Sequence, residues 1–343
     1  MVIDFKNLNI NSLISQTEFE NKVISFIKCW FSESEKLSVQ TSGSTGKPKI
    51  FDIEKEKMHH SAKMTCDFLD LKEGDSALLC LPVEYISGKM MVVRSIERKL
   101  KLYIKEPSLT PLKNLEETID FCAMTPLQVE NSLDKIHLIR KLIIGGAAVS
   151  ESLKKKIFEV GKPKSEVQRI YETYGMSETL SHIALKQIFP EEEKCFEVFN
   201  GIDISKDERG CLIINAPQLN SKILQTNDLV ELFENKKFRF LGRIDNVINS
   251  GGAKIFPEEL EAIVKKEISN EVVFLGIPDE TLGQKLMLVV EGTENEELNH
   301  QLSTINYQPK FHKPKETLFI EKIPRTPNGK VNRRELLNLI MEQ

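Results

Sequence analysis

The 343-residue sequence lacks the features that would place it in several large classes of protein. It contains no run of about 18 apolar residues, so it predicts no membrane-spanning helix, and its amino terminus has no continuous apolar stretch of the export-signal kind. Its six cysteines include no C-x-x-C pair, which argues against both a zinc site and a disulfide framework. We therefore expect reduced thiols, a cytoplasmic location and no membrane partner.

The sequence also has no excess of basic residues. Its 47 lysines and arginines are mixed along the chain with 51 aspartates and glutamates, which leaves a net charge of −4. A nucleic-acid-binding protein needs a concentrated positive surface, and none is indicated here, so we expect no nucleic-acid partner. With 40% hydrophobic residues, a chain of this length can bury a large core and favours two unequal domains.

Apolar residues follow two different patterns in the larger, amino-terminal part. Between residues 76 and 171, short apolar runs alternate with segments in which apolar residues recur every three or four positions. This pattern predicts strands covered on both faces by helices, which is the α/β class. After residue 178, apolar runs alternate with polar turns, which predicts a smaller antiparallel β subdomain.

The pattern changes again after the sequence GRIDN at residues 242–246. Pro257 is followed directly by two glutamates, which favours a helix that begins there. Two strands and a final helix are predicted after it, over residues 271–277, 285–292 and 332–342. We therefore predict a large layered α/β domain with a β subdomain over residues 1–244, and a small α+β domain over residues 245–343.

Residues 41–49 read TSGSTGKPK and combine glycines, hydroxyl groups and lysines. Glycines let backbone N–H groups approach an anion closely, and hydroxyl and ammonium groups add further donors. The segment therefore predicts a polyphosphate-binding loop, although a flexible linker has a similar composition. Lys47 is followed by Pro48, which is the wrong order for the common nucleotide loop of kinases and GTPases.

A second segment, YETYGMSET at residues 171–179, places two aromatic rings, a glycine and two glutamates after a predicted strand. Alone, it indicates either a ligand-binding turn or an ordinary strand end with a half-buried tyrosine. Together with residues 41–49, it resembles the motifs of the adenylate-forming superfamily, which comprises acyl-CoA synthetases, luciferases and peptide-synthetase adenylation domains. That resemblance implies the superfamily's fold, in which the small C-terminal domain is mobile.

Three further segments match this superfamily in the expected order. They contain the turn Gly145-Gly146-Ala147, the pair Asp228 and Arg243, and Lys330 in the phrase IPRTPNGKVNRREL. The match extends over residues 41–334. Taken singly, such a turn, an ion pair or a lysine is also common on ordinary protein surfaces.

The sequence departs from the superfamily pattern at three positions. Ile50 replaces the glycine usual after Lys49, Asn227 replaces the glycine usual before Asp228, and Tyr85 replaces a histidine of many relatives. Asparagine tolerates left-handed backbone angles, so the second departure is mild. Tyr85 has no imidazole that could act in place of that histidine.

The resemblance implies that ATP is a substrate, that Mg²⁺ is the cofactor and that coenzyme A is a co-substrate. It assigns the phosphates of ATP to the loop residues Thr41, Ser42, Gly43, Ser44, Thr45, Gly46 and Lys49. It assigns the adenine and the ribose to Gly145, Gly146, Ala147, Glu172, Tyr174, Gly175, Asp228 and Arg243. Glu178 and Thr45 would hold Mg²⁺, a hard cation that needs few protein ligands when phosphate supplies the rest.

The reaction that the superfamily catalyses brings two anions together, because a carboxylate attacks a phosphate. By resemblance, Lys330 is the cation placed between them. The superfamily then rotates its C-terminal domain to form a thioester, and Asp245 occupies the hinge position. Gly251, Gly252 and Lys254 follow the hinge and would face the CoA tunnel.

The acid substrate is suggested by two phrases, LPVEYISGKMMVVR and GMSETLSHIALK. They are most similar to those of o-succinylbenzoate:CoA ligases of menaquinone synthesis, some of which are compact like this chain. A substrate with two carboxylates needs a second cation, and Arg94 or Lys89 on one predicted helix can supply it, unless both lie on a solvated helix face. Tyr85, Ser181 and His182 are further candidates for the acid pocket, although a lone histidine is more often structural.

The interpretation favoured by the sequence is therefore an AMP-forming acid:thiol ligase, with o-succinylbenzoate as the best candidate acid. One alternative is an enzyme that loads another aryl or short-chain acid onto CoA or a carrier-protein thiol. A nucleotide-binding module without turnover is the third, and Glu178 and Lys330 argue against it. The sequence does not indicate an oligomeric state.

Overall fold

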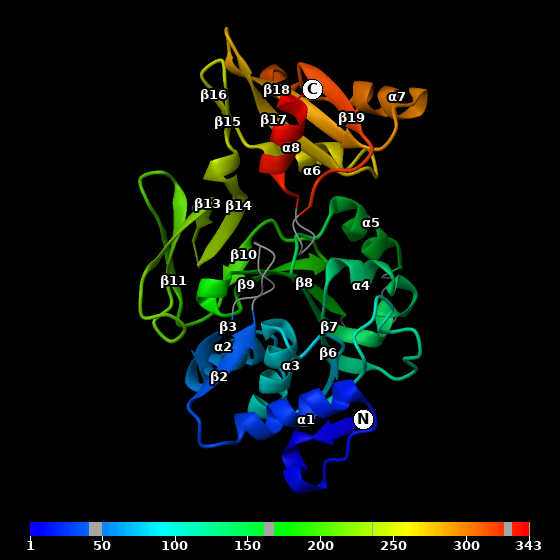
Figure 1. Cartoon of the computed structure of the whole chain (residues 1–343), viewed down its shortest axis with the longest axis vertical. Helices are drawn as coiled ribbons and strands as arrows, with labels where there is room; N and C mark the ends of the chain where they lie inside the picture. Colours follow the sequence, from blue (N-terminus) through cyan, green and yellow to red (C-terminus); the bar gives the residue numbers. More distant parts are fainter. Residues whose placement is uncertain (41–49, 161–167, 235, 326–330, 343) are drawn as a thin grey trace.

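The computed structural model describes residues 1–40, 50–160, 168–234, 236–325 and 331–342. Figure 1 shows a large body formed by the amino-terminal part and a small body, coloured yellow to red, formed by the carboxyl-terminal part. The predicted phosphate loop, with Thr41, Ser42, Gly43, Ser44, Thr45, Gly46 and Lys49, lies outside the described residues. So does the predicted catalytic lysine, Lys330.

The large body is organised by a sheet that has twelve strands in the described residues, in the order β1-β5-β4-β6-β7-β8-β9-β10-β14-β13-β12-β11. Strands β5, β4, β6, β7 and β8 run parallel, as the α/β pattern predicted. The predicted antiparallel strands continue this sheet, because β9 pairs directly with β8. The strand bounds are Val2–Asp4 (β1), Ser76–Leu79 (β4), Lys101–Ile104 (β5), Ile119–Met124 (β6), Ile139–Ile144 (β7), Arg169–Gly175 (β8), His182–Phe189 (β9), Phe196–Val198 (β10), Asp203–Lys206 (β11), Cys211–Asn215 (β12), Leu224–Phe233 (β13) and Lys237–Arg243 (β14).

Helices cover both faces of the parallel strands. On β4, Ala77 and Leu79 belong to one apolar core while Leu78 belongs to the other, as does Cys80 directly after the strand, because successive side chains of a strand point to opposite faces. The first core includes residues of α1, α2 and α3, and the second includes residues of α4 and α5. These helices span Glu18–Trp30 (α1), Lys55–Phe68 (α2), Ile86–Glu97 (α3), Pro126–Glu130 (α4) and Glu151–Val160 (α5).

Shorter elements complete the large body. Strands β2 (Lys36–Gln40) and β3 (Ile50–Glu54) form a separate antiparallel pair. Helix α1 begins where the Thr17 side chain accepts a hydrogen bond from the backbone of Glu20, which satisfies one of the free N–H groups of its first turn. Short 3₁₀ turns span Phe5–Asn7 (η1), Ile10–Ser12 (η2), Leu133–Leu138 (η3), Ser177–Thr179 (η4), Ile244–Asn246 (η5) and, in the small body, Lys310–His312 (η6).

The small body has its own sheet, in which β16, β15, β18 and β17 are neighbours in that order and β19 pairs with β18. The predicted helix at Pro257 is confirmed as α6 (Pro257–Val264), and the predicted strands as β17 (Val272–Asp279) and β18 (Gly283–Glu291). The predicted final helix is α8 (Arg333–Met341). The sequence did not predict β15 (Ile248–Ser250), β16 (Ala253–Ile255), α7 (Glu296–Thr304) or β19 (Glu316–Ile320).

The two bodies meet at the end of β14. The chain leaves the large sheet at Arg243 and enters the small sheet at Ile248. Asn246 donates a hydrogen bond to Glu258 Oε1 at 2.5 Å, and the Lys155 amine contacts the carbonyl of Lys266. Gly242 has a φ of +143°, a backbone angle that favours glycine, and a Cβ there would also lie 2.5 Å from Glu258 Oε2. No helix in the described ranges is long and apolar enough to cross a membrane.

Candidate active site

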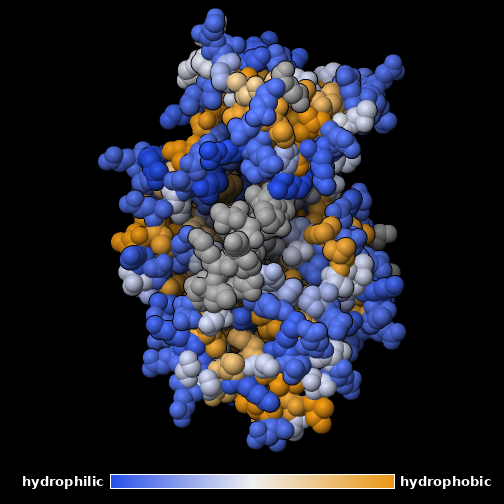
Figure 2. Space-filling view, viewed as in Figure 1, coloured by the Kyte–Doolittle hydropathy of each residue, from blue (hydrophilic) through white to orange (hydrophobic). Residues whose placement is uncertain are grey.

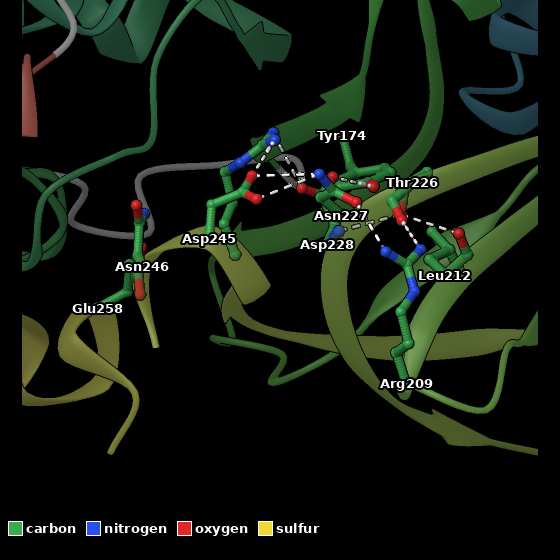
Figure 3. Close-up of polar contacts among 10 residues, drawn as sticks. Tyr174, Arg209, Leu212, Thr226, Asn227, Asp228, Asp245, Asn246 and Glu258 are labelled. Atoms are coloured by element: carbon green, nitrogen blue, oxygen red, sulfur yellow. Dashed lines mark hydrogen bonds and ion pairs between the residues drawn. The ribbon is translucent and has the colours of Figure 1, made fainter. Parts of the chain in front are cut away.

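The hydroxyl of Tyr174, at the end of β8, points at the carboxylate of Asp228 on β13 (Figure 3). It donates a hydrogen bond to Asp228 Oδ2 at 2.6 Å. The tyrosine ring packs against Phe238 and Phe196, with centroids 4.9 and 5.7 Å away. Burial and the nearby Asp228 charge raise the pKa of Tyr174, so the phenol keeps its proton and remains a donor.

Asp228 and Arg243 are brought together by the pairing of β13 with β14, in which they lie directly opposite each other. Arg243 Nη1 lies 3.4 Å from Asp228 Oδ1, a longer contact than the tyrosine bond on the other oxygen. The Asp228 backbone N–H donates to the Thr226 hydroxyl at 3.1 Å. The Asp228 side chain is thus fixed in a largely buried place, yet one of its oxygens can still accept a hydrogen bond from a ligand hydroxyl.

Asp245, the predicted hinge residue, lies in η5 and is exposed. It accepts hydrogen bonds from Arg243 Nη2 at 3.0 Å and from the Asn227 amide at 3.2 and 3.3 Å (Figure 3). The bond from Arg243 is the main reason that the pKa of Asp245 lies below its usual value. The carboxylate is therefore held by two residues of the large sheet.

The glycine turn follows β7 and lies beside β8. A Cβ on Gly145 would meet the Thr173 hydroxyl oxygen at 2.8 Å, so the turn is pressed against the residue next to Tyr174. Gly146 has a φ of +91° and no atom within 4 Å of its Cβ position, and Ala147 is exposed. A turn with so little side-chain bulk leaves its backbone open, and its predicted contact with a flat base stays a prediction.

Glu172 is buried, and its carboxylate is fully engaged within the protein. One oxygen accepts the Val149 backbone N–H at 3.0 Å, and the other pairs with the Lys186 amine at 2.8 Å. Its side chain is therefore not available to a ligand, and its backbone lies in the sheet between Ile144 of β7 and Lys186 of β9. The predicted contact of this backbone with adenine stays a prediction. Gly175 ends β8 against β9, where a Cβ would lie 2.4 Å from His182 Cα, so a larger residue would force the two strands apart.

Glu178, the predicted magnesium ligand, lies in η4 with its side chain exposed. Its carboxylate makes no hydrogen bond or ion pair with any residue that the structure describes, whereas its backbone carbonyl accepts a hydrogen bond from the Asn220 amide at 3.0 Å. The described ranges hold no group of three His, Cys, Asp or Glu residues that could bind a metal. One free carboxylate fits a Mg²⁺ ion whose other ligands are phosphate and water.

Arg94 of α3 is the most unusual charged group in the large body, because it is only 2% exposed and no described carboxylate pairs with it. Its Nη2 donates to the Ser181 hydroxyl at 3.1 Å, while its Nε, also buried, has no partner. Burial lowers the pKa of Arg94 to about 10, so the guanidinium remains charged at neutral pH. A buried cation without a counter-ion is costly, which points to an anionic ligand that pairs with it.

His182 completes this cluster. Its Nε2 lies 3.1 Å from the Thr65 hydroxyl of α2, and its Nδ1 lies 3.4 Å from the Ser181 hydroxyl. Burial and the Arg94 charge lower the pKa of His182 well below its usual value, so the ring is neutral. The sequence favoured a structural histidine, and its buried hydrogen bond to Thr65 agrees with that interpretation.

Lys89 does not join Arg94, although both belong to α3. Its amine donates to the backbone carbonyls of Glu84 and Ser38, at 3.2 and 3.3 Å, and lies 5.8 Å from the centre of the Phe26 ring. Burial lowers the pKa of Lys89 as well. It lines a hollow of about 530 Å³ beside α1 and β2, away from Ser181. Tyr85, directly before α3, is 37% exposed.

Gly251 and Gly252 form the two-residue turn of the β15–β16 hairpin, with φ values of +57° and +81°. Positive φ at both positions is the backbone that glycine adopts most easily. Lys254 follows in β16 and is exposed. In Figure 1 this hairpin points away from the large body.

Sequence reasoning missed the bond between Tyr174 and Asp228, which lie 54 positions apart, and the bond from Asn220 to Glu178. No local pattern marks either contact, because each depends on how strands pair in the sheet. Near the hinge, the sequence did offer one signal, which is the asparagine at position 227 in place of the usual glycine. An asparagine side chain can donate a hydrogen bond to Asp245, whereas glycine has no side chain.

A protein-family model described as AMP-binding enzyme matches residues 39–201. The chain is 26% identical to the 2-succinylbenzoate–CoA ligase of Lactococcus lactis over 372 residues, which cover 96% of this chain and 80% of that protein. It is 25% identical to the 2-succinylbenzoate–CoA ligase of Listeria monocytogenes, over 95% of this chain and 74% of that protein.

Solved structures are also similar. An acyl-CoA synthetase (AMP-forming)/AMP-acid ligase II-like protein from Dyadobacter fermentans is 33% identical, with a TM-score of 0.66, over 99% of this chain and 100% of that one. The O-succinylbenzoate coenzyme A synthetase of Bacillus subtilis, in complex with ATP and magnesium ion, is 21% identical, with a TM-score of 0.69, over 87% of this chain and 69% of that one. Because the second structure is only 21% identical, its similarity is evidence for the fold alone.

Proposed function

The chain belongs to the AMP-binding enzyme family, and we propose that it is an AMP-forming acid:CoA ligase whose acid is o-succinylbenzoate. The observation that carries this proposal is the buried, unpaired guanidinium of Arg94, which suits an acid with a second carboxylate. The similarity to proteins named 2-succinylbenzoate–CoA ligase, over nearly the whole chain, supports the same acid.

The nucleoside of ATP binds between the glycine turn and the end of β8. The open backbone at Gly146 and the Tyr174 ring flank the adenine, and Asp228 accepts hydrogen bonds from the ribose hydroxyls. Tyr174 orients that carboxylate through its hydroxyl, while Arg243 supports it from the neighbouring strand. The loop at residues 41–49 grips the phosphates.

The acid carboxylate must approach the α-phosphate although both are anions. Two unit charges about 4 Å apart repel by about 4 kcal/mol at an effective dielectric constant of about 20. Lys330 is the cation that offsets this repulsion, and its ammonium group stays between the two anions as the C–O–P bond forms and pyrophosphate leaves. Glu178 and Thr45 would hold Mg²⁺, which would supply further positive charge to the phosphates.

The described elements on either side of residues 326–330 support this proposal. The flanking elements β19 and α8 belong to the small body, and the end of α8 where the helix begins faces the large body in Figure 1. Asn332 precedes α8 and its side chain caps the helix by accepting the Glu335 N–H at 3.3 Å. The start of α8, which follows Lys330 in the sequence, therefore lies on the side of the small body that faces the large body.

The second half-reaction transfers the acyl group to the CoA thiol, with release of AMP. We propose that the domain of residues 245–343 turns about Asp245 between the two halves, so that Gly251, Gly252 and Lys254 replace Lys330 beside the acyl group. We also propose that the enzyme works in the cytoplasm, where CoA and ATP are available.

The far carboxylate of the acid binds Arg94. The guanidinium fork matches a carboxylate geometrically, and Ser181 adds a hydroxyl that can turn to donate. Neutral His182 fixes that wall of the pocket through Thr65, and it adds no repulsion to the cation because it is uncharged. Lys89 of α3 has no part in this pocket, because its amine donates to backbone carbonyls of Ser38 and Glu84. Tyr85 lies directly before α3, the helix that carries Arg94.

One experiment tests the proposal. The protein is mixed with ATP, Mg²⁺ and a panel of carboxylic acids, and pyrophosphate release and thioester formation are followed with and without CoA. We expect o-succinylbenzoate to give pyrophosphate and, only with CoA, a thioester. A preference for an acid with one carboxylate contradicts the assignment of the acid. Adenylate without transfer to CoA indicates a carrier-protein thiol, and no turnover of any acid rejects the ligase.

A further inference from the structure

Arg209 precedes β12 and fixes the side chain of Asn227 on β13 (Figure 3). Its Nη1 donates to Asn227 Oδ1 at 3.1 Å, and its Nη2 donates to the Thr226 carbonyl at 3.0 Å. Asp207 holds the guanidinium from the other side by accepting its Nε at 2.8 Å. Because the amide oxygen of Asn227 faces a cation, the NH₂ group of the same amide must face the opposite way.

That NH₂ group meets Asp245, the carboxylate of the segment that connects the two bodies. Asn227 Nδ2 lies 3.2 and 3.3 Å from the two Asp245 oxygens, and Arg243 Nη2 lies 3.0 Å from one of them. We call residues 244–247 the linker. A chain of alternating donors and acceptors therefore runs from the β11–β12 turn of the large body into the linker.

Polar contacts hold the linker, and none of the residues of its 3₁₀ turn, η5, is fully buried. Beside it lies a cavity of about 260 Å³, which Ile244 and Val247 of the linker line together with Arg209, Leu229, Asn249, Lys254 and Phe256. In Figure 2, hydrophilic side chains gather along the margin where the small body faces the large one. An element with this little apolar contact can change its backbone angles at low cost once its polar contacts are released.

The structure shows one orientation of the small body. The start of α8 faces the large body, while the Gly251-Gly252 hairpin points away from it (Figure 1). In the two-step reaction proposed above, this is the orientation that forms the adenylate, since the lysine segment precedes α8 and the hairpin serves the thioester step.

We propose that Asn227, oriented by Arg209, is a positioning residue that holds Asp245 and so favours the adenylate-forming orientation. This inference rests on the proposed function for its two half-reactions, but its contacts do not depend on which acid is used. A glycine at position 227 has no side chain to make the bond, so this control of the domain orientation belongs to the asparagine of this chain.

The test compares Asn227→Ala with a matched control, Asn299→Ala. Asn299 on α7 donates to the Glu294 carboxylate at 2.8 Å, so the control removes an exposed bond of the same kind away from the linker. Asn227→Asp places two carboxylates face to face, and Asn227→Asp combined with Asp245→Asn restores one donor and one acceptor. For each variant, the rate of pyrophosphate release without CoA is divided by the rate of thioester formation from supplied acyl-adenylate and CoA.

The ratio of these two rates reports the ratio of the populations of the two orientations of the small body. We expect Asn227→Ala to lower it by about tenfold, which corresponds to about 1.4 kcal/mol, because a hydrogen bond to a charged group is lost from one orientation only. Asn227→Asp should lower it further, the exchanged pair should return it to within about twofold of wild type, and Asn299→Ala should leave it unchanged. Equal losses in both half-reactions would indicate a merely structural role and overturn the proposal.

A second readout needs no substrate. Hydrogen exchange of the linker amides, measured on the free protein, should accelerate by about fivefold to tenfold in Asn227→Ala and stay unchanged in Asn299→Ala. If the exchange rate of the linker amides is unchanged in Asn227→Ala, the proposal is overturned even when the activity of the variant falls. If the wild-type protein forms no adenylate with any acid, the proposed function fails, while this exchange measurement still decides whether Asn227 holds the linker.

Discussion

Replacement of Tyr174 by phenylalanine removes one hydroxyl group and leaves the aromatic cluster in place. The ring remains packed against Phe238 and Phe196, so the apolar area that it buries is unchanged. What is lost is the 2.6 Å hydrogen bond to Asp228, whose side chain then keeps only the 3.4 Å contact with Arg243. The variant therefore tests only how the Tyr174 hydroxyl orients the Asp228 carboxylate, which we propose accepts hydrogen bonds from ribose.

The size of the effect follows from the burial of this bond. A hydrogen bond to a charged group contributes about 1.5–3 kcal/mol, and Asp228 is 9% exposed, so little solvent can replace the lost donor. We expect the free energy of unfolding to fall by about 1.5–3 kcal/mol. A misoriented carboxylate also binds ribose less well, and a loss of about 1.4 kcal/mol there raises the KM for ATP about tenfold.

The assay combines urea denaturation with steady-state kinetics at varied ATP and at varied acid. The KM for ATP should rise while the KM for the acid stays the same. Tyr171→Phe is the matched control, because Tyr171 lies on the same strand and its ring packs against Phe68 rather than near Asp228. An unchanged KM for ATP together with unchanged stability would refute the role of the hydroxyl.

The same variant has a distinct pH dependence. The folded protein raises the pKa of Tyr174, whereas the unfolded chain titrates near pH 10. The stabilising effect is fully present below about pH 10 and is lost as the pH rises further, because only the unfolded chain then releases the proton. Wild-type stability should fall more steeply above about pH 10 than the stability of Tyr174→Phe.

Three further predictions concern the acid pocket and the metal. Arg94→Ala should raise the KM for a dicarboxylic acid at least about tenfold and leave the KM for ATP unchanged in steady-state assays; a similar rise for benzoate, which has no second carboxylate, would contradict the pairing. Glu178→Gln should raise the Mg²⁺ concentration that supports half-maximal pyrophosphate release, and an unaltered Mg²⁺ titration would remove Glu178 from the metal site. The folded state lowers the pKa of His182, so its contribution to stability is present above about pH 6.5 and is lost as the pH falls. His182→Gln should weaken this loss in denaturation curves recorded from pH 7 to 5, and identical slopes for the two proteins would show that the ring is not a buried neutral group.

The elements that the sequence predicted are those that local periodicity decides. Strand β18 is a run of apolar residues between polar ends, and α6 begins at a proline followed by glutamates, so both could be read from neighbouring positions. Strands β15 and β16 have three residues each, too few for a periodic pattern, and were missed for that reason.

The candidate site was predictable only as separate segments. The motifs around Tyr174 and Asp228 were each identified by resemblance, yet their contact arises because β8, β9, β10, β14 and β13 follow one another in a single sheet. Similarly, helical spacing placed Lys89 and Arg94 on one helix but did not decide where each side chain points. Packing decides that, and it directs Arg94 to Ser181 and Lys89 to Ser38.

The central claim is that the acid attacks the α-phosphate of ATP to form an acyl-adenylate, and oxygen labelling tests it most directly. Acid with ¹⁸O in its reacting carboxylate is turned over with ATP, Mg²⁺ and CoA, and the products are analysed by mass spectrometry. One oxygen of the carboxylate bridges to phosphorus in the adenylate and leaves with AMP when the CoA thiol attacks. We predict AMP that carries one ¹⁸O atom and unlabelled pyrophosphate. Label in inorganic phosphate alongside ADP, or AMP without label, would contradict the account.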